Sequence, residues 1–253
     1  MYMKKLLLVL LTSLLAIALF GCGESKDENV LTMATELTFE PYEFKDGDKA
    51  VGIDVEIAEA ICAKLGKKLE VVDIAFGSII PSIESNKYDF GMAGITVNEE
   101  RLNQVNFTDS YATGVQVVIV NEGSKITSVD DLFAEGANNV VGTQEGTTGF
   151  IYASDEIETA GLGEVKSFEK TTDAATALLN NQIDCIILDN EPAKSIVAKN
   201  AGLKILDTEY SVEDYAIAIN KDNTELLNAV NGALQELIAD GTVENIVNKY
   251  INK

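Results

Sequence analysis

Apolar residues recur along this chain with two alternating periods, one typical of helices and one typical of buried strands. Within residues 54–65, five apolar residues share one face of a helix, namely Ile57, Ala58, Ile61, Cys62 and Leu65. The strands expected from short apolar runs are residues 30–35, 69–73, 89–94, 115–120, 139–143, 183–189 and 215–220. The expected helices are residues 54–65, a segment after Ser78, residues 173–181, 192–200 and 223–239, and a short last helix to Tyr250.

The alternation of strands and helices indicates an α/β protein. A strand, a helix and a second strand in series form a βαβ unit, in which the two strands are parallel. The rhythm therefore predicts a mainly parallel sheet with helices on both faces. The pattern starts again at Ser128-Val129-Asp130-Asp131, which has the residue types of a capping box, so we expect a second unit of the same kind.

A short internal similarity links the two units. Residues 83–89 (IESNKYD) lead into an apolar strand that ends at Gly94, and residues 178–184 (LLNNQID) lead into another that ends at Asp189. The same spacing of 95 residues separates Ile83 from Leu178 and Gly94 from Asp189. This similarity has two possible explanations: two ordinary turns of βαβ units, or two similar lobes that face each other. In the second case Gly94 and Asp189 lie on opposite walls of one cleft, because ligands bind at the carboxyl ends of strands in open α/β sheets.

The N-terminal segment has the features of an export signal. Lys4 and Lys5 precede an apolar run over residues 6–20, which has the length of a secretory signal core and is short for a membrane span. The run ends in Leu19-Phe20-Gly21-Cys22, which resembles the bacterial lipobox, although Phe20 is bulkier than the usual residue there. An ordinary signal peptide with an incidental cysteine is the alternative. We expect a signal peptide over 1–21, a lipid on Cys22 and a polar tether over 22–29.

Composition excludes several classes of function. The net charge of −22 argues against nucleic acid, which needs a basic face. The chain contains no histidine, and none of its cysteines, Cys22, Cys62 and Cys185, forms a CxxC pair. We therefore expect no metal and no cofactor, and we expect Cys62 and Cys185 to be buried free thiols.

Several stretches, taken in their order and spacing, resemble the family 3 bacterial extracellular solute-binding proteins of polar amino-acid ABC importers. The resemblance covers residues 31–250, and it is carried by Ala34-Thr35-Glu36, Pro41-Tyr42-Glu43-Phe44, Val51-Gly52-Ile53-Asp54-Val55, Ile80-Pro81-Ser82-Ile83, Ala93-Gly94-Ile95-Thr96, Glu100-Arg101, Val105-Asn106-Phe107-Thr108-Asp109, Gly146-Thr147-Thr148 and Ala239-Asp240-Gly241-Thr242. It implies a type II periplasmic-binding-protein fold, with two βαβ lobes joined by hinge crossings near Thr113 and Asp214. Lobe 1 would comprise residues 30–113 and 214–253, and lobe 2 residues 114–213.

Arg101 is the only arginine of the chain. Its planar fork can hold a carboxylate by two parallel hydrogen bonds, which lysine cannot do. A surface pair with Glu99 or Glu100 is the alternative from composition alone. The resemblance implies that Arg101 binds the α-carboxylate of the ligand, together with the backbone amide of Thr148.

The remaining candidate ligand contacts follow from the resemblance, each with a structural alternative. Asp189 would receive the α-ammonium, or it caps the following helix. Gly94, where relatives often carry serine, would offer its carbonyl, and Thr96 its hydroxyl. Thr147 lies at a helix N-terminus and would bind the ligand or cap the helix. Phe39 and Phe76 would sandwich the side chain of the ligand, or they lie in the core. Glu36 would face the far end of the ligand side chain. Tyr42 and Glu43 would be pocket rim or solvated face.

The predicted function is binding of an amino acid for an ABC importer, without catalysis. Glu36 favours a cationic or amide ligand, such as arginine, lysine, ornithine or glutamine, and cystine is a further option. The expected partners are the permease subunits and, through the lipid alone, the membrane at the outer cell surface or in the periplasm, with the protein as a monomer. The alternatives are a sensor or adhesin with the same clamp, or an enzyme similar to cyclohexadienyl dehydratase that uses Glu36, Glu40 or Glu43.

Overall fold

The computed structural model describes residues 27–251, and those from Leu31 onward form one compact unit. The signal peptide expected over residues 1–21, the lipidation of Cys22 and most of the tether expected over 22–29 lie outside the described residues. Between residues 27 and 251, no helix combines the length and the apolar character needed to cross a membrane.

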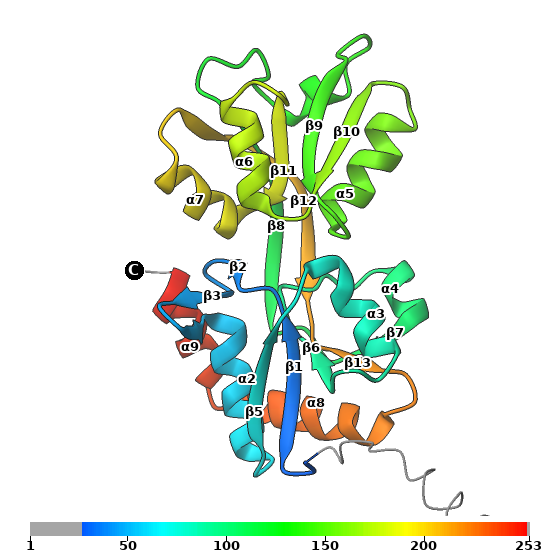
Figure 1. Ribbon diagram of the computed structural model, residues 1–253, viewed down its shortest axis with the longest axis vertical. Helices are drawn as coiled ribbons and strands as arrows, with labels where there is room; N and C mark the ends of the chain where they lie inside the picture. Colours follow the sequence, from blue (N-terminus) through cyan, green and yellow to red (C-terminus); the bar gives the residue numbers. More distant parts are fainter. Residues whose placement is uncertain (1–26, 252–253) are drawn as a thin grey trace, which may run out of the picture. The chain divides into compact units, whose positions relative to one another are not determined.

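The first of two five-stranded sheets combines the start and the end of the compact unit (Figure 1). Its strand order is β5 (Lys68–Asp73), β1 (Val30–Thr35), β6 (Phe90–Gly91), β13 (Ala218–Asn220) and β7 (Val105–Phe107). Strand β6 runs parallel to β1, whereas β13 runs antiparallel to both β6 and β7. The late strand β13 thus completes a sheet that the first third of the chain begins.

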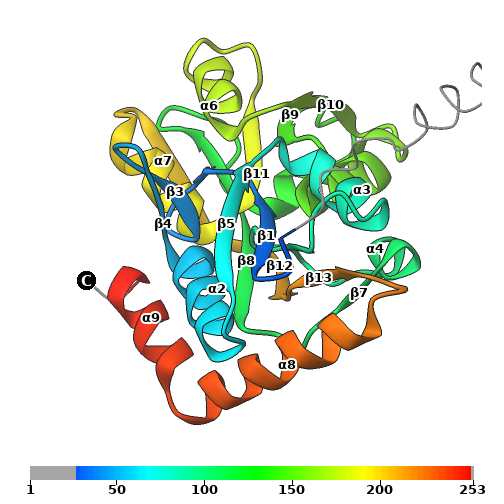
Figure 2. The same cartoon turned by 60° about the horizontal axis from the view of Figure 1, so that its bottom comes forward.

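Helices from both chain segments cover this sheet. They are α2 (Ile53–Lys64), α3 (Ile79–Glu84), α4 (Glu99–Gln104), α8 (Thr224–Ala239) and α9 (Thr242–Ile251). The C-terminal helices α8 and α9 contact each other, and both contact α2, as Figure 2 shows. The apolar stripe of α8 is buried at Val230, Ala233, Leu234 and Leu237.

The second sheet comes from the middle of the chain. Its strand order is β10 (Gly163–Phe168), β9 (Asn139–Gln144), β11 (Cys185–Asp189), β8 (Ala112–Asn121) and β12 (Leu203–Tyr215). Strands β9, β10 and β11 are parallel, and β8 is antiparallel to β11 and β12. Its helices are α5 (Thr148–Ala153), continued by a π-helical turn over Ser154–Glu158, α6 (Thr171–Leu179) and α7 (Asn190–Lys199). The capping box expected at Ser128 is present and opens a 3-10 turn over Val129–Leu132.

In both sheets the strands are mainly parallel, as predicted, but each sheet is mixed because one of its strands runs in the opposite direction. The reversed strand is β8 in the second sheet, which opposes β11 and β12, and β13 in the first sheet, which opposes β6 and β7. Hydrophobic periodicity identifies a strand but contains no information on its direction. The direction of these two strands is decided by the route of the chain between the lobes.

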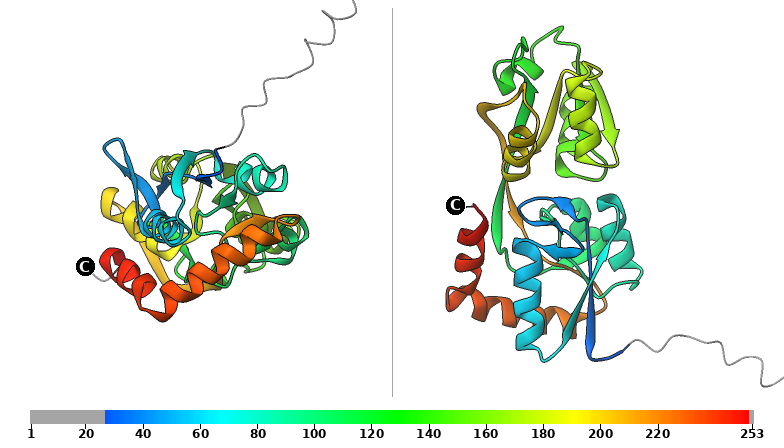
Figure 3. Two further views of the ribbon diagram at one scale, coloured as in Figure 1. Left: turned by 90° about the horizontal axis from the view of Figure 1, so that it is seen from below. Right: turned by 60° about the vertical axis from the view of Figure 1, so that its left-hand side comes forward.

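Two crossings connect the lobes, and they lie side by side (Figures 1 and 3). In the β8–β12 ladder, Thr113 is the partner of Asp214 and Ala112 is the partner of Tyr215. The contact continues beyond the ladder, because the Tyr111 N–H donates to the Tyr215 carbonyl at 3.0 Å. The two crossings therefore form a single hydrogen-bonded ribbon.

Some element bounds differ from the sequence prediction. The strand expected over 89–94 is limited to Phe90–Gly91, because the chain turns at Gly94, whose φ is +54°. The run expected over 215–220 is divided between the end of β12 and β13. The first part of β12 was missed because register shifts between Ile205 and Ser211 break its alternation of apolar and polar residues.

A small three-stranded sheet was also missed. It consists of β2 (Thr38–Phe39), β3 (Glu43–Asp46) and β4 (Lys49–Val51). Tyr42 and Glu43 are buried by it, so neither belongs to a solvated face. Gly52 ends this segment with φ +129°, in a place where a Cβ atom would overlap the Tyr42 carbonyl.

The internal similarity corresponds to two equivalent turns. Asn86 and Asn181 have φ values of +57° and +53°, and each ends a helix in the left-handed region. Asp89 then accepts a hydrogen bond from the Thr32 N–H at 2.7 Å, and Asp184 accepts one from the Val140 N–H at 2.7 Å. In each lobe, an aspartate thus ties the incoming strand to the neighbouring strand.

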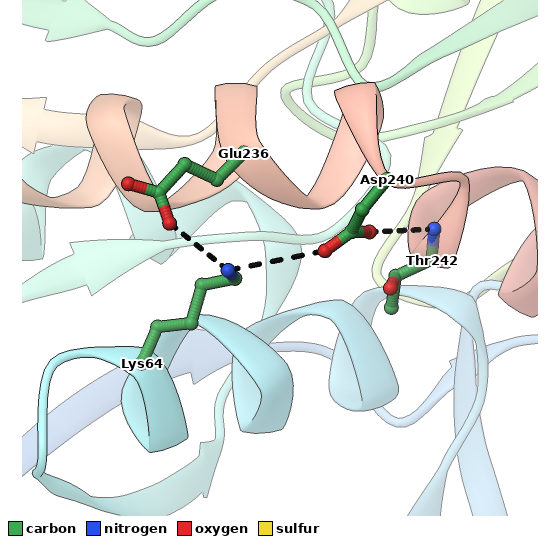
Figure 4. Close-up of polar contacts among 4 residues, drawn as sticks. All are labelled: Lys64, Glu236, Asp240 and Thr242. Atoms are coloured by element: carbon green, nitrogen blue, oxygen red, sulfur yellow. Dashed lines mark hydrogen bonds and ion pairs between the residues drawn. The ribbon is translucent and has the colours of Figure 1, made fainter.

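Polar contacts at the base of lobe 1 link α2 to the C-terminal helices (Figure 4). The Lys64 ammonium contacts the Glu236 carboxylate at 2.9 Å and the Asp240 carboxylate at 3.9 Å. Asp240 also accepts from the Thr242 N–H at 3.0 Å at the start of α9. These contacts link α2 to the end of α8 and, through Asp240, to the start of α9.

Candidate functional site

Arg101 is buried between the lobes, with an exposed fraction of 5%. The side chain of Asn98 caps the short helix α4 by accepting from the Arg101 N–H at 2.8 Å, which directs Arg101 inward. Its Nη1 donates to the Thr96 carbonyl at 2.7 Å, and its Nη2 donates to the Gly146 carbonyl of lobe 2 at 2.9 Å. The guanidinium carbon lies 5.5 Å from the centre of the Phe76 ring. Between residues 27 and 251 Arg101 forms no ion pair, so pairing with Glu99 or Glu100 is not found.

The loop that contains Gly94 and Thr96 rests on buried acids. The Gly94 N–H donates to Asp54 at 2.8 Å, and the Tyr111 hydroxyl donates to the same oxygen at 2.8 Å. Burial raises the pKa of Asp54 to about 7. Burial and the neighbouring Asp54 raise the pKa of Glu43 well above its ordinary value. A Cβ atom at Gly94 would come 2.9 Å from the Phe39 ring, so this loop is fitted to glycine.

Asp189 lies at the junction of β11 and α7, where the sequence left two roles open. It occupies the N-cap position of α7, but its side chain makes no capping hydrogen bond. Instead, its carboxylate accepts from the Tyr215 hydroxyl. Burial, with a smaller contribution from the nearby Glu213 carboxylate, raises the pKa of Asp189 to about 7. The ring of Tyr215 also lies against Gly94, so one residue contacts both walls.

The turn before α5 places two threonines in different roles. The Thr147 hydroxyl donates to the Gln144 carbonyl at 2.8 Å and accepts from the Phe150 N–H at 3.2 Å, so it caps the helix. The hydroxyl of the buried Thr148 donates to Glu213 at 3.0 Å. The Thr96 hydroxyl of lobe 1 donates to the same carboxylate at 2.9 Å. Glu213 therefore joins residues that the sequence assigned to opposite walls.

Glu36 and Gln144 form a second contact between the lobes. The Gln144 side-chain amide donates to one Glu36 oxygen at 2.6 Å and to the Glu169 carbonyl at 2.9 Å. The other Glu36 oxygen is buried and has no hydrogen-bond partner among the described residues. Burial raises the pKa of Glu36 to about 7, against the lowering effect of Gln144. An acceptor of this kind suits a cationic or amide group.

The two phenylalanines occupy separate positions. Phe39 stacks on Tyr42 with ring centres 5.8 Å apart, and Phe76 lies under Arg101. Between residues 27 and 251 the two rings make no contact with each other, so the expected sandwich around a ligand stays a prediction. A cavity of about 300 Å³ opens beside Phe76, Arg101 and Gly146.

A second cavity of about 420 Å³ lies between β2 and the helices α6 and α7. Glu40 and Lys199, which form an ion pair, are among its lining residues. Cys62 and Cys185 are buried and free, one in each lobe, as the sequence indicated. Within the described part of the chain, no group of three or more histidine, cysteine, aspartate or glutamate side chains is placed to hold a metal ion.

Sequence reasoning missed Gln116, Gln144, Glu213 and Tyr215 at this site. A signal for Glu213 exists, because counting back by two from the buried Tyr215 places Glu213 on the inner face. The structure agrees with that count, since Val212 is 62% exposed and Glu213 is 5% exposed. Hydrophobicity alone would have placed Val212 on the inner face and Glu213 on the outer face.

Comparison with known proteins gives consistent results. The sequence profile described as "Bacterial extracellular solute-binding proteins, family 3" matches residues 31–253. The arginine-binding extracellular protein ArtP of Bacillus subtilis is 30% identical, over 98% of each chain. An ancestral arginine-binding protein solved with arginine is 38% identical, with a TM-score of 0.82 over 88% of this chain and 99% of the other. An ancestral arginine-binding protein solved with glutamine is 37% identical, with a TM-score of 0.81 over 90% and 100%.

Proposed function

The chain belongs to the bacterial extracellular solute-binding proteins of family 3, and we propose that it is the substrate-binding component of an ABC importer for an amino acid. The observation that carries this proposal is the burial of one arginine and one aspartate around the Gly94–Thr96 loop, with Glu213 and Tyr215 between them. A zwitterion presents one carboxylate and one ammonium to such a site. Buried charges need partners of this kind.

The α-carboxylate of the ligand binds Arg101 and the backbone N–H of Thr148. In the present contacts, the Arg101 fork donates to two neutral backbone carbonyls. A ligand carboxylate replaces them with charge-assisted hydrogen bonds, which are about twice as strong. Since the second carbonyl belongs to lobe 2, Arg101 is in reach of both lobes at once.

The α-ammonium binds Asp189, the Gly94 carbonyl and the Thr96 hydroxyl. Burial raises the pKa of Asp189 to about 7, and an adjacent ammonium favours its ionised form. In the resulting ion pair, each buried charge has a partner of opposite sign. Thr147 contributes indirectly, by capping the helix that carries Thr148.

The side chain of the ligand reaches Glu36 and Gln144, with Phe39 and Phe76 beside its apolar part. Glu36 has one buried oxygen without a donor among the described residues, and a guanidinium supplies several donors. We therefore propose L-arginine as the preferred ligand and glutamine as a weaker one. The names of the similar proteins support this choice.

The chain is proposed to act at the membrane surface, as a monomer held by a lipid on Cys22 and a tether over residues 22–29. The signal-like residues 1–21 and the extracellular description of the family support export. The permease subunits of the importer are its proposed partners. In this arrangement, the acidic clamp captures solute outside the membrane and releases it to the permease.

A thermal-shift screen of the chain from residue 23 onward against the twenty amino acids tests the proposal. L-arginine is expected to stabilise the protein most, by about 2.7 kcal/mol at 100 times its Kd. Binding of leucine-like or acidic amino acids alone would contradict the role of Glu36. Absence of stabilisation by any amino acid would contradict the proposed function as a whole.

A further inference from the structure

One carboxylate oxygen of Glu213 connects three separate segments of the chain. Its Oε2 accepts from the Thr96 hydroxyl at 2.9 Å, from the Thr148 hydroxyl at 3.0 Å and from the Gln116 amide at 3.1 Å. Thr96 belongs to lobe 1, Thr148 opens α5 in lobe 2, and Gln116 lies on the first crossing. Glu213 itself lies on the second crossing, so its carboxylate connects both lobes and both crossings.

The surroundings of Glu213 are buried and charged. All three donor residues are at most 5% exposed. Tyr152 also lies beside this carboxylate, and burial together with Glu213 raises the pKa of Tyr152 to about 12. Glu213 is close enough to influence Arg101, whose pKa burial lowers while Glu213 opposes that shift, and it raises the pKa of Asp189. It therefore lies between the groups proposed to bind the two charges of the ligand.

These contacts decide whether the hydroxyls of Thr96 and Thr148 donate or accept a hydrogen bond toward the ligand. An ionised carboxylate only accepts hydrogen bonds, and a threonine hydroxyl has a single hydrogen to donate. Once Thr96 and Thr148 donate to Glu213, their oxygens can only accept from a ligand. An ammonium group, which only donates, fits such oxygens, whereas a carboxylate does not.

We propose that Glu213 is a positioning residue that commits the hydroxyls of Thr96 and Thr148 as acceptors, and thereby makes this end of the cleft select ligands with an ammonium group. The inference rests on the proposed amino-acid binding. It assigns the ligand carboxylate to the Arg101 fork and the backbone amide of Thr148. The hydroxyls of both threonines are reserved for the ammonium side.

Titration calorimetry with three probes tests this role. L-arginine carries both charged groups, agmatine lacks the carboxylate, and 5-guanidinopentanoate lacks the ammonium. Glu213→Ala is expected to lower the affinity for L-arginine and for agmatine by about tenfold or more. Without Glu213, the two threonine hydroxyls are no longer held as acceptors for the ammonium group. The same variant should change the affinity for 5-guanidinopentanoate by less than about twofold.

Two further variants separate hydrogen bonding from charge and from folding. Glu213→Gln keeps a carbonyl that accepts from both hydroxyls, so it should retain the preference for L-arginine over 5-guanidinopentanoate to within about threefold. Thr96→Val removes one of the acceptors and should lower the same preference without any change at Glu213. If Glu213→Ala fails to fold, these two variants still decide the question.

Asp214→Ala is the matched control, because it removes an exposed acid from the neighbouring position of the same strand. It should leave all three affinities within about twofold of wild type. An equal loss for all three probes in Glu213→Ala would show a purely structural role, and Glu213→Gln behaving like Glu213→Ala would show a role of charge alone. Either result overturns the inference. Wild-type protein that binds none of the probes contradicts both the proposed function and this inference.

Discussion

At the scale of single residues, Arg101 makes the most specific demand on the ligand. Its two terminal nitrogens donate in different directions to Thr96 and Gly146, and a lysine ammonium has no equivalent fork. Arg101→Lys should weaken L-arginine binding by about 10- to 100-fold, which corresponds to the loss of one charge-assisted hydrogen bond. Arg101→Ala should weaken it further, because the buried carboxylate then has no partner. Calorimetry with L-arginine measures both effects.

Glu100→Gln is the control for this prediction. Glu100 neighbours Arg101 in sequence but is exposed and forms no ion pair with it in the described part of the chain. Its removal should change the affinity by less than about twofold. An Arg101→Lys variant with wild-type affinity would remove the carboxylate contact from the proposed function.

Asp189 makes binding sensitive to pH. Burial raises the pKa of its carboxyl to about 7 in the free protein, so the carboxyl is largely protonated below that pH. Binding of an ammonium requires the ionised form, and a proton must therefore leave on binding. The affinity for L-arginine should fall by about tenfold between pH 8 and pH 6 for one such group. Calorimetry in buffers of different ionisation enthalpy should detect the released proton.

Asp189→Asn tests the assignment of that proton. The variant should bind more weakly at pH 8 but with a smaller dependence on pH, because its side chain cannot ionise. Glu36, whose pKa burial also raises to about 7, should account for the remaining dependence. An affinity of the wild-type protein that stays constant from pH 8 to pH 6 is incompatible with this prediction.

At the scale of elements, the turn after β6 depends on the acids beneath it. Gly94 adopts φ +54° and donates its N–H to Asp54, which is held in the first turn of α2. Asp54 thus links the helix to the loop that presents the Gly94 carbonyl. The adjacent Glu43 comes from β3, so three elements meet below the candidate ammonium site.

This arrangement makes the stability of the free protein depend on pH. The folded-state pKa of Asp54 is raised by burial from 3.8 to about 7, so its favourable contribution is complete below pH 3.8 and is lost as the pH rises through 7. Asp54→Asn keeps an acceptor for the Gly94 N–H and cannot ionise. We expect it to increase the free energy of unfolding at pH 8 by on the order of 1–3 kcal/mol, and to have a smaller effect at pH 5.

Chemical denaturation of both proteins at the two pH values provides the measurement. Asp46→Asn serves as a control, since it removes an exposed acid from β3, the strand that contains Glu43. Its effect should be similar at both pH values. A destabilised Asp54→Asn protein at pH 8 would indicate that the ionised carboxylate, and not its neutral form, supports the loop.

At the scale of the whole molecule, the two lobes and their paired crossings give the chain the form of its family. The candidate ligand contacts come from both sides of the crossings, so we propose that capture of the solute closes the two lobes on each other. We propose that the lobe boundaries lie at the expected positions, with residues 30–113 and 214–253 in lobe 1. Thr113 and Asp214, where the crossings were expected, are partners in the β8–β12 ladder.

The attachment of the molecule to the membrane is proposed to depend on one residue outside the described part of the chain. Cys22 follows Leu19-Phe20-Gly21, and lipidation there would leave the clamp on a tether of about eight residues. Cys22→Ser should therefore yield uncleaved or released protein, where the wild type stays in the membrane fraction. Mass spectrometry of the mature N-terminus measures the lipid directly. A wild-type mature protein that starts elsewhere and has no lipid would contradict the anchor.

Local physical chemistry determined much of this molecule from its sequence alone. The helices with a long apolar stripe, such as α2 and α8, were predicted almost to their ends, because their periodicity depends only on neighbouring residues. The motif order identified the family, which the match over residues 31–253 confirms. The candidate residues Arg101 and Asp189 also stood out locally, one as the only arginine and the other as an acid that ends an apolar strand.

Only the tertiary structure decided what depends on residues far apart in the sequence. The reversed directions of β8 and β13 follow from the crossings, which hydrophobic periodicity does not encode. Glu213 meets Thr96, Gln116 and Thr148 across 117, 97 and 65 residues of chain, and nothing in the local sequence of Glu213 or Gln116 singled them out. Burial strengthens their contacts, because a hydrogen bond or an ion pair is stronger where water is excluded. Water is excluded from these groups only in the assembled fold.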